Sequence, residues 1–318
     1  MTLDSLTPAP RPGTWQRLRP LPEPRSHIPP VVHGGRIYVF GGGGHAFSSQ
    51  NSVWAYDPAE DRWERCADMP TRRSGTVALK ADGRIHVMGG GFKQPNGKFR
   101  FLTTVEVYDP EADRWERGPE LLQPHDYPAA AHYRGRFYVL GGHHPDATEG
   151  GPKTDPGFDF CERLDPAGGA WERIAPLGQP RFALAAAVLQ GRLLTFGGVA
   201  FRPEGFDNFD LVEVYDPEAD RWERHPELRL PWPAAGLGAC VADERLYVFG
   251  GYSTDDIHPR CACYDPATGR WERLPDMPAP RAAMGVAVLD GVIYLVGGWA
   301  DDGRTPQDSL FAYRLPRG

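Results

Sequence analysis

Short runs of apolar residues recur along the chain, and six of them end at a pair of glycines. Residues 36–40 and 292–296 are two such runs, and both are rich in the β-branched and aromatic side chains that are typical of buried strands. Turn sequences such as Asp82-Gly83 and Asp290-Gly291 lie between the runs and favour tight hairpins. The pattern predicts an all-β fold.

The glycine pairs mark an internal repeat, with successive pairs between 47 and 56 residues apart. Six pairs follow an apolar run in this way: Gly41-Gly42, Gly89-Gly90, Gly141-Gly142, Gly197-Gly198, Gly250-Gly251 and Gly297-Gly298. An Asp-Pro turn and then a tryptophan follow each of the first five pairs: Trp63, Trp115, Trp171, Trp222 and Trp271. One ten-residue segment, Tyr-Asp-Pro-Glu-Ala-Asp-Arg-Trp-Glu-Arg, is identical at residues 108–117 and 215–224. A period of this length indicates a repeat architecture.

This repeat resembles the kelch repeat, and the resemblance covers nearly the whole chain. In that family each repeat is one four-stranded blade of a β-propeller. The residues fit such a blade on physical grounds as well. A glycine pair leaves room for a neighbouring backbone, the Asp-Pro pair begins a type I turn, and the tryptophan provides apolar surface for the next blade.

The sixth repeat is incomplete, because a single strand at residues 309–315 follows its glycine pair and no tryptophan comes after it. Residues 14–18, Thr-Trp-Gln-Arg-Leu, resemble Arg-Trp-Glu-Arg-Leu at residues 270–274. We therefore expect the N-terminal segment to supply the outer strand of the last blade and to close the ring. The sequence predicts one domain, residues 1–318, that is a six-bladed kelch-type β-propeller. The expected strand sets are about 25–65, 72–117, 125–173, 181–224, 233–273 and 281–315 plus 14–18.

Charge and composition restrict the partners. A net charge of −7 argues against nucleic acid and anionic membranes, and no apolar run is long enough to span a bilayer. The polar, Pro-rich start does not resemble a secretory signal, and the five cysteines lack the spacing of a zinc site or a disulfide framework. We expect a cytoplasmic, monomeric protein, from a bacterium, that binds neither nucleic acid nor membranes.

Two sets of loops in a kelch-like blade open at the same end of the central channel: the connection that precedes the inner strand and the loop that follows the glycine pair. The residues 16 positions before each glycine pair form one ring at this end, namely Arg25, Arg73, His125, Arg181, Ala234 and Arg281. The arginines have two interpretations. They are a structural feature of the repeat, or they bind an anionic ligand.

The departures from the repeat gather at the same end. The third blade has His125, Asp126 and Tyr127 in one loop and His143 and His144 in the other. The first blade adds His27 and His45, and aromatic side chains complete the predicted rim: Phe92, Trp232, Tyr252 and Trp299. Imidazoles, a carboxylate and a phenol in an aromatic funnel are suited to acid–base chemistry on a small molecule, although six polar loops also collect some histidines by chance.

The long loop at residues 143–159 belongs to the same blade, and its glycines and prolines suggest a lid over the funnel. The histidines could also hold a zinc, copper or iron ion. Nothing in their spacing requires one, so we predict neither a metal nor a cofactor.

Two hypotheses follow. In the first, the chain is an acid–base enzyme of the isomerase, mutarotase, cyclase or lyase type, which the architecture permits because sialic-acid mutarotase-like proteins are solitary kelch propellers with a similar layout. The expected catalytic residues are His125, Asp126, Tyr127 and His143. The expected ligands of a small, possibly anionic substrate are Arg25, His27, His45, Arg73, Phe92, His144, Arg181, Trp232, Tyr252, Arg281 and Trp299. In the second, the same face is a non-catalytic interaction module that binds an acidic peptide or protein, as kelch domains of larger proteins do.

Overall fold

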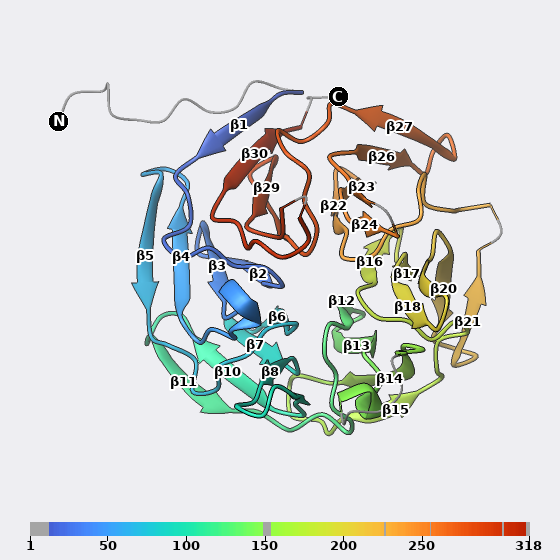
Figure 1. The fold of residues 1–318 in the computed structure, drawn as a ribbon, viewed down its shortest axis with the longest axis horizontal. Helices are drawn as coiled ribbons and strands as arrows, with labels where there is room; N and C mark the ends of the chain where they lie inside the picture. Colours follow the sequence, from blue (N-terminus) through green and yellow to red (C-terminus); the bar gives the residue numbers. More distant parts are fainter. Residues whose placement is uncertain (1–12, 149–153, 226, 255, 301, 316–318) are drawn as a thin grey trace.

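The computed structural model describes residues 13–148, 154–225, 227–254, 256–300 and 302–315. Six four-stranded antiparallel sheets are arranged as blades around a central axis (Figure 1). The first strands of neighbouring blades contact one another around the channel, and the fourth strands lie at the periphery. The predicted six-bladed propeller is confirmed.

The strands follow the same order in every blade, from the channel outward. Blade 1 contains β2 (Pro30–His33), β3 (Arg36–Phe40), β4 (Val53–Asp57) and β5 (Arg62–Cys66). Blade 2 contains β6 (Val77–Ala81), β7 (Arg84–Met88), β10 (Val105–Asp109) and β11 (Arg114–Arg117). Blade 3 contains β12 (Ala129–Tyr133), β13 (Arg136–Gly142), β14 (Phe158–Leu164) and β15 (Glu172–Ile174).

Blades 4 to 6 repeat this arrangement. Blade 4 contains β16 (Ala185–Leu189), β17 (Arg192–Phe196), β20 (Val212–Asp216) and β21 (Arg221–Arg224). Blade 5 contains β22 (Gly238–Ala242), β23 (Arg245–Phe249), β26 (Cys261–Asp265) and β27 (Arg270–Leu274). Blade 6 contains β28 (Gly285–Leu289), β29 (Val292–Val296), β30 (Leu310–Arg314) and, from the other end of the chain, β1 (Trp15–Leu18).

The ring closes through β1, as the sequence predicts. This strand pairs with β30 in antiparallel register, with Trp15 opposite Tyr313 and Leu18 opposite Leu310. The indole Nε1 of Trp15 also donates a hydrogen bond of 3.1 Å to the carbonyl of Pro275 in blade 5. The two ends of the chain are therefore joined by a sheet, and blade 6 has no missing strand.

The glycine pairs are the points of closest approach between blades. Both glycines of every pair have positive φ. The amide of the second glycine donates to the carbonyl of the next blade, as Gly42 does to Arg73 at 2.9 Å and Gly298 to Arg25 at 2.9 Å. A Cβ on Gly89 would lie 2.6 Å from the carbonyl oxygen of His125. Glycine is required here because it readily adopts a positive φ and because there is no space for a Cβ.

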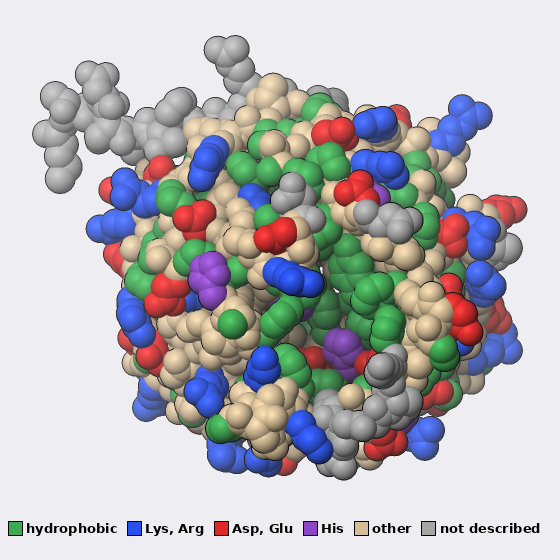
Figure 2. All heavy atoms as spheres, in the orientation of Figure 1, with side chains coloured by type: hydrophobic (Ala, Val, Ile, Leu, Met, Phe, Trp, Pro, Cys, Tyr) green, Lys and Arg blue, Asp and Glu red, His purple; other side chains and the backbone are tan. Residues whose placement is uncertain are grey.

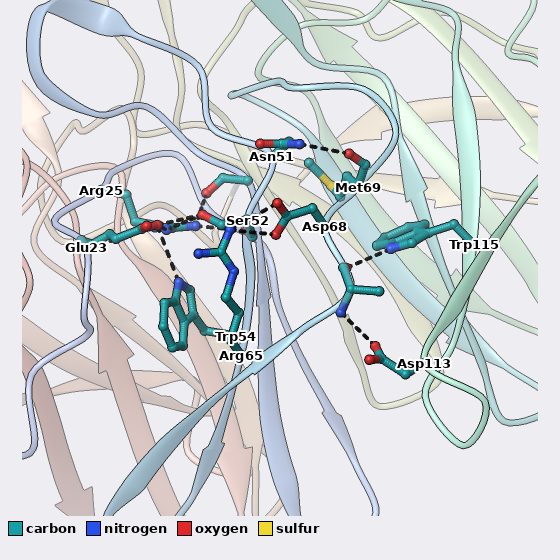
Figure 3. Close-up of polar contacts among 12 residues, drawn as sticks. Glu23, Arg25, Asn51, Ser52, Trp54, Arg65, Asp68, Met69, Asp113 and Trp115 are labelled. Carbon is teal, nitrogen blue, oxygen red and sulfur yellow. Dashed lines mark hydrogen bonds and ion pairs between the residues drawn. The ribbon is translucent and has the colours of Figure 1, made fainter.

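The outer tryptophans also join neighbouring blades. Figure 3 shows Trp115 of blade 2, whose Nε1 donates to the carbonyl of Ala67 at 2.9 Å. Asp113 accepts hydrogen bonds from the backbone amide of Ala67 at 2.7 Å and from the hydroxyl of Tyr108 at 2.5 Å. The outer tryptophan donates such a hydrogen bond to the preceding blade in all six blades, and blades 1, 2 and 4 add the Tyr–Asp contact, so the motif specifies contacts between blades as well as a turn.

Helical structure is sparse. Among the described residues it consists of two short 3₁₀ turns, η2 (His45–Phe47) and η3 (Pro145–Thr148). Within the described part of the chain, no helix has the length and apolar character needed to cross a membrane.

Candidate functional site

A funnel opens at the end of the channel where the sequence predicts a site. Its rim is built from the loops after the glycine pairs, three of which form two-stranded ribbons: β8 (Gly91–Lys93) with β9 (Phe99–Phe101), β18 (Val199–Arg202) with β19 (Gly205–Asn208), and β24 (Tyr252–Ser253) with β25 (Asp256–Ile257). Figure 2 shows a hollow on this face with apolar walls and histidine and acidic side chains at its floor. Two adjoining cavities of about 570 and 750 Å³ share the residues His27, Tyr127, His143, Asp155, Phe201 and Trp299.

The floor of the funnel is a ring of six left-handed residues, one from each blade: His27, Gly75, Tyr127, Ala183, Gly236 and Ala283. Backbone hydrogen bonds of 2.7 to 3.0 Å join them at five of the six steps between blades, as from Ala183 to the carbonyl of Tyr127. Four members are glycine or alanine, so the side chains of His27 and Tyr127 fill the centre, with ring centroids 4.4 Å apart. Bulky side chains in this backbone conformation are unusual and tend to occur at functional sites.

His143 is fixed at the side of the floor by a carboxylate and two aromatic rings. Its Nδ1 lies 2.6 Å from Oδ2 of Asp155, and its ring stacks on Phe182 with centroids 3.9 Å apart and on Phe101 at 5.7 Å. The other oxygen of Asp155 accepts two backbone amides, at 2.9 and 3.2 Å. This arrangement directs Nε2 of His143 toward Asp126, whose Oδ2 is 3.9 Å away.

The protonation of this pair follows from its contacts. Burial opposes the charged imidazole, but the hydrogen bond that Nδ1 donates to Asp155 and the charges of Asp126 and Asp155 raise the pKa of His143 above its usual 6.5. Burial likewise opposes the charged carboxylate, but the hydrogen bond and charge of His143 lower the pKa of Asp155 below 3.8. The two groups stabilise one another as an ion pair.

Asp126 and His27 differ from that pair. Burial raises the pKa of Asp126 to about 7, with His143 opposing the shift and Asp155 adding to it. Burial, together with the charge of His143, lowers the pKa of His27 to about 3, so this imidazole is neutral. Neighbouring groups with divergent pKa values are the usual arrangement for acid–base catalysis.

Tyr127 contributes its ring to the funnel and directs its hydroxyl elsewhere. The hydroxyl is buried, and a Cβ on Gly236 of blade 5 would lie 2.6 Å from it. Burial and the neighbouring Tyr252 raise the pKa of Tyr127 well above its usual 10. We therefore keep Tyr127 as a wall of the site and remove it from the proton-transferring groups.

The arginine ring does not face the funnel. Arg73 is fully buried, and its guanidinium donates to the carbonyls of Gly89 at 3.1 Å and Thr104 at 2.7 Å and to Glu106 at 2.5 Å. The other arginines are buried in the same manner: Arg25 with Glu23 and Ser52 (Figure 3), Arg181 with Glu213 and Thr195, and Arg281 with Ser309. We remove all four from the predicted substrate-binding residues, because the guanidinium groups stabilise the blades from within.

His125 occupies the position of these arginines and has the same contacts. It is fully buried, its Nδ1 lies 2.6 Å from the carbonyl of Gly141, and its Nε2 lies 3.0 Å from Glu162. The catalytic role predicted for it is therefore corrected, since this imidazole is enclosed within the blade and lines neither cavity. In blade 5 this position is Ala234, which has no polar side chain. Trp232 makes the equivalent contact instead, because its Nε1 donates a hydrogen bond of 3.1 Å to the carbonyl of Gly250. Trp232 is consequently a core residue and is also removed.

Three further predicted residues lie outside the two cavities. His45 is exposed in η2, Phe92 packs under the guanidinium of Arg72, and the ring of His144 packs against Phe158. The predicted residues that do line the funnel are His27, Asp126, Tyr127, His143, Tyr252 and Trp299.

Sequence reasoning missed Asp155 and part of the aromatic walls, namely Phe101, Phe182 and Phe201. The described end of the long loop supplies Asp155, which pairs with the backbone of Phe201 at 2.7 and 2.8 Å. Residues 149–153 of the expected lid at residues 143–159 lie outside the described residues. Phe182 comes directly after Arg181, the ring arginine of blade 4. This position in the sequence could have identified it as a residue of the funnel. Among the described residues, no group of three or more His, Cys, Asp or Glu side chains is placed to hold a metal.

Comparisons with known proteins agree with this architecture. Residues 12–258 match the family model described as the Attractin/LZTR1 beta-propeller, and residues 280–315 match the Kelch motif. A solved structure, entitled "Structure of YjhT", superimposes with a TM-score of 0.75 at 17% identity and covers 92% of this chain and 95% of that one. A likeness at this identity concerns the fold alone.

Curated relatives are larger than the aligned region. The chain is 28% identical over 172 residues to Kelch repeat and BTB domain-containing protein 12 of Danio rerio, with coverage of 51% of this chain and 27% of that protein. It is 27% identical over 213 residues to Kelch-like protein 23 of Homo sapiens, with coverage of 67% and 35%. Alpha-scruin of Limulus polyphemus is 26% identical over 205 residues, with coverage of 62% and 21%. The match thus spans well under half of each relative.

Proposed function

This chain belongs to the kelch β-propeller family, and from the site at the end of its channel we propose that it is a small-molecule enzyme working by general acid–base catalysis. The reaction is of the isomerase, mutarotase, cyclase or lyase type. The observation that carries the proposal is the placement of His143, held by Asp155 at 2.6 Å and directed toward Asp126 on an aromatic-walled floor. Acid and base are then within reach of one ligand.

The two groups have complementary roles. The carboxylate of Asp126 accepts a proton from the substrate, and the imidazolium of His143 donates a proton from Nε2 to another atom of it. Asp155 keeps the Nδ1 proton in place and stabilises the imidazolium. Asp126 then returns its proton to His143, 3.9 Å away, so the cycle consumes no proton. Proton transfer of this kind accounts for roughly 10²–10⁴-fold in rate.

A metabolite experiment tests the proposal. Purified protein is incubated with the low-mass fraction of an extract from the source cells, and the metabolites that change are identified by mass spectrometry. We expect His143→Asn to abolish the change although the variant, which loses stability with its contact to Asp155, remains folded at the assay temperature. The matched variant His45→Asn, an exposed imidazole outside the funnel, should retain it. Conversion that survives His143→Asn, or is lost equally in His45→Asn, contradicts the proposal.

A second candidate is a non-catalytic interaction module that binds a peptide or protein at the mouth of the funnel. Phe47 and Phe206 favour it, because these apolar side chains are 42% and 44% exposed in two different loops of the rim. An acidic partner would contact Lys98 and Arg304 there, since the ring arginines are buried. A pull-down from extract that is lost in Phe47→Ser and Phe206→Ser but unaffected by His143→Asn would favour this function.

A further inference from the structure

The carboxylate of Asp126 lacks the partner that a buried carboxylate normally has. Its side chain is 13% exposed, and no described residue donates a hydrogen bond to either oxygen. The nearest charged group is His143, at 3.9 Å, which is beyond hydrogen-bonding distance. Buried carboxylates are seldom left in this condition, because the loss of hydration is not compensated.

The neighbouring groups are committed elsewhere. The Nδ1 of His143 pairs with Asp155, and Asp155 accepts two backbone amides in addition. His27 lies on the floor as a neutral ring whose Nδ1 contacts the hydroxyl of Ser26 at 2.8 Å. The cationic side chains that line the cavities, Lys98 and Arg304, are exposed at the rim. None of these side chains is in hydrogen-bonding contact with Asp126, so its carboxylate remains open to a cation that the ligand carries.

The walls suit a cation with an apolar body. Phe101, Phe201 and Trp299 line the same cavity as Asp126, and the faces of aromatic rings attract cations in a desolvated site. The remaining acidic side chains of the funnel, Asp155, Asp256 and Asp302, disfavour an anion. The expectation of an anionic substrate depended on the arginine ring, and those guanidinium groups are buried within the blades.

We infer that the funnel binds an organic cation, an amine or quaternary ammonium group on an apolar body, with the positive charge against Asp126 and the body between the aromatic walls. This inference rests on the proposed function, because it names the substrate class of the same site. A charge-assisted contact of this kind should favour a cation over its uncharged isostere about tenfold or more.

The test uses three probes of matched shape: benzylamine, benzyl alcohol and benzoate, titrated calorimetrically at pH 8 into the full chain. We expect benzylamine to bind about tenfold or more tightly than benzyl alcohol, and benzoate to bind least. Asp126→Asn should abolish the preference for benzylamine while retaining the affinity for benzyl alcohol. Asp256→Asn is the control, because it removes the same charge from a side chain that is 65% exposed at the rim. It should change the preference about twofold or less.

Three results overturn the inference: benzoate binding as tightly as benzylamine, a preference that persists in Asp126→Asn, or an equal loss in Asp256→Asn. These binding results leave open whether metabolite conversion depends on His143. The metabolite experiment therefore tests the proposed function separately. Failure of all three probes to bind also overturns the inference. If conversion is lost as well, both proposals fail together.

Discussion

The buried pair of Arg73 and Glu106 allows the structural interpretation of the arginine ring to be tested quantitatively. Both side chains are almost completely buried and lie 2.5 Å apart, and Thr71 donates a second hydrogen bond to Glu106 at 2.7 Å. Glu106→Ala leaves the guanidinium charged and without its anion in the interior. Burial already lowers the pKa of Arg73, with Glu106 opposing the shift, so loss of the carboxylate makes the charged form still less favourable.

The expected loss is about 3–5 kcal/mol, as is typical when one partner of a buried ion pair is removed. For a chain of 318 residues the entropy of unfolding is about 0.7 kcal/mol/K, so the melting temperature should fall by about 4–7 °C. In Arg73→Met/Glu106→Ala neither charge remains. The double variant should therefore lose less stability than the sum of the two single variants, by about 1–3 kcal/mol. Blade 5, with Ala234 and Ala262 at the equivalent positions, is a natural example of such a site.

Calorimetry and urea unfolding of the wild type, the two single variants and the double variant measure this coupling. Arg72→Ala is the control, because this neighbouring arginine is exposed and packs over Phe92. It should change stability by about 0.5–1 kcal/mol at most. A cost below about 1 kcal/mol for Glu106→Ala, or strict additivity in the double variant, would refute the reasoning and return the arginines to the candidate binding residues.

Three other predictions follow from particular contacts. Gly89→Ala should destabilise the folded protein by more than about 2 kcal/mol, because φ is 63° and the new Cβ would lie 2.6 Å from a carbonyl oxygen. Gly83→Ala is the control in the same melting assay and should cost about 1 kcal/mol, because φ is also positive there but the space around it is open. Burial raises the pKa of Asp126 from 3.8 to about 7, so between these pH values the folded state retains a proton that the unfolded chain releases. The stability of the wild type should therefore fall as the pH rises from 3.8 to about 7. Asp126→Asn should remove that decline in melting temperature, and an unchanged pH profile would contradict the burial argument. Asp155→Asn should lower the pKa of His143 in an NMR titration; an unaltered titration would show that the contact does not set its protonation.

The fold could be predicted from the sequence because every blade repeats the same local requirements. Glycine pairs, Asp-Pro turns and the outer tryptophan are fixed by backbone geometry and by contacts with the neighbouring blade, and these constraints recur at a constant period. The ring closure was also predictable, since Trp15 resembles the outer tryptophans. What the sequence did not reveal is that the motif's Asp residues accept amides from the preceding blade, as Asp113 does from Ala67.

The site was predictable in its location but only partly in its members. His125 stood out because it departs from the repeat, yet a departure in sequence need not be a departure in role. An imidazole between the carbonyl of Gly141 and Glu162 replaces a guanidinium between Gly89 and Glu106. Asp155 was missed for the opposite reason, because no repeat position marks it. Its role arises from a loop conformation that places it beside His143.

The most direct test of the account is the melting temperature of the wild type and His143→Asn in two fractions of source-cell extract, low-mass and macromolecular. A ligand present at about a hundred times its dissociation constant contributes roughly 2.7 kcal/mol, which corresponds to about 4 °C for this chain. The account predicts a rise of this order for the wild type in the low-mass fraction and a smaller rise for His143→Asn. A rise in the macromolecular fraction alone, equal in both proteins, would contradict it and identify the rim as a surface for protein recognition.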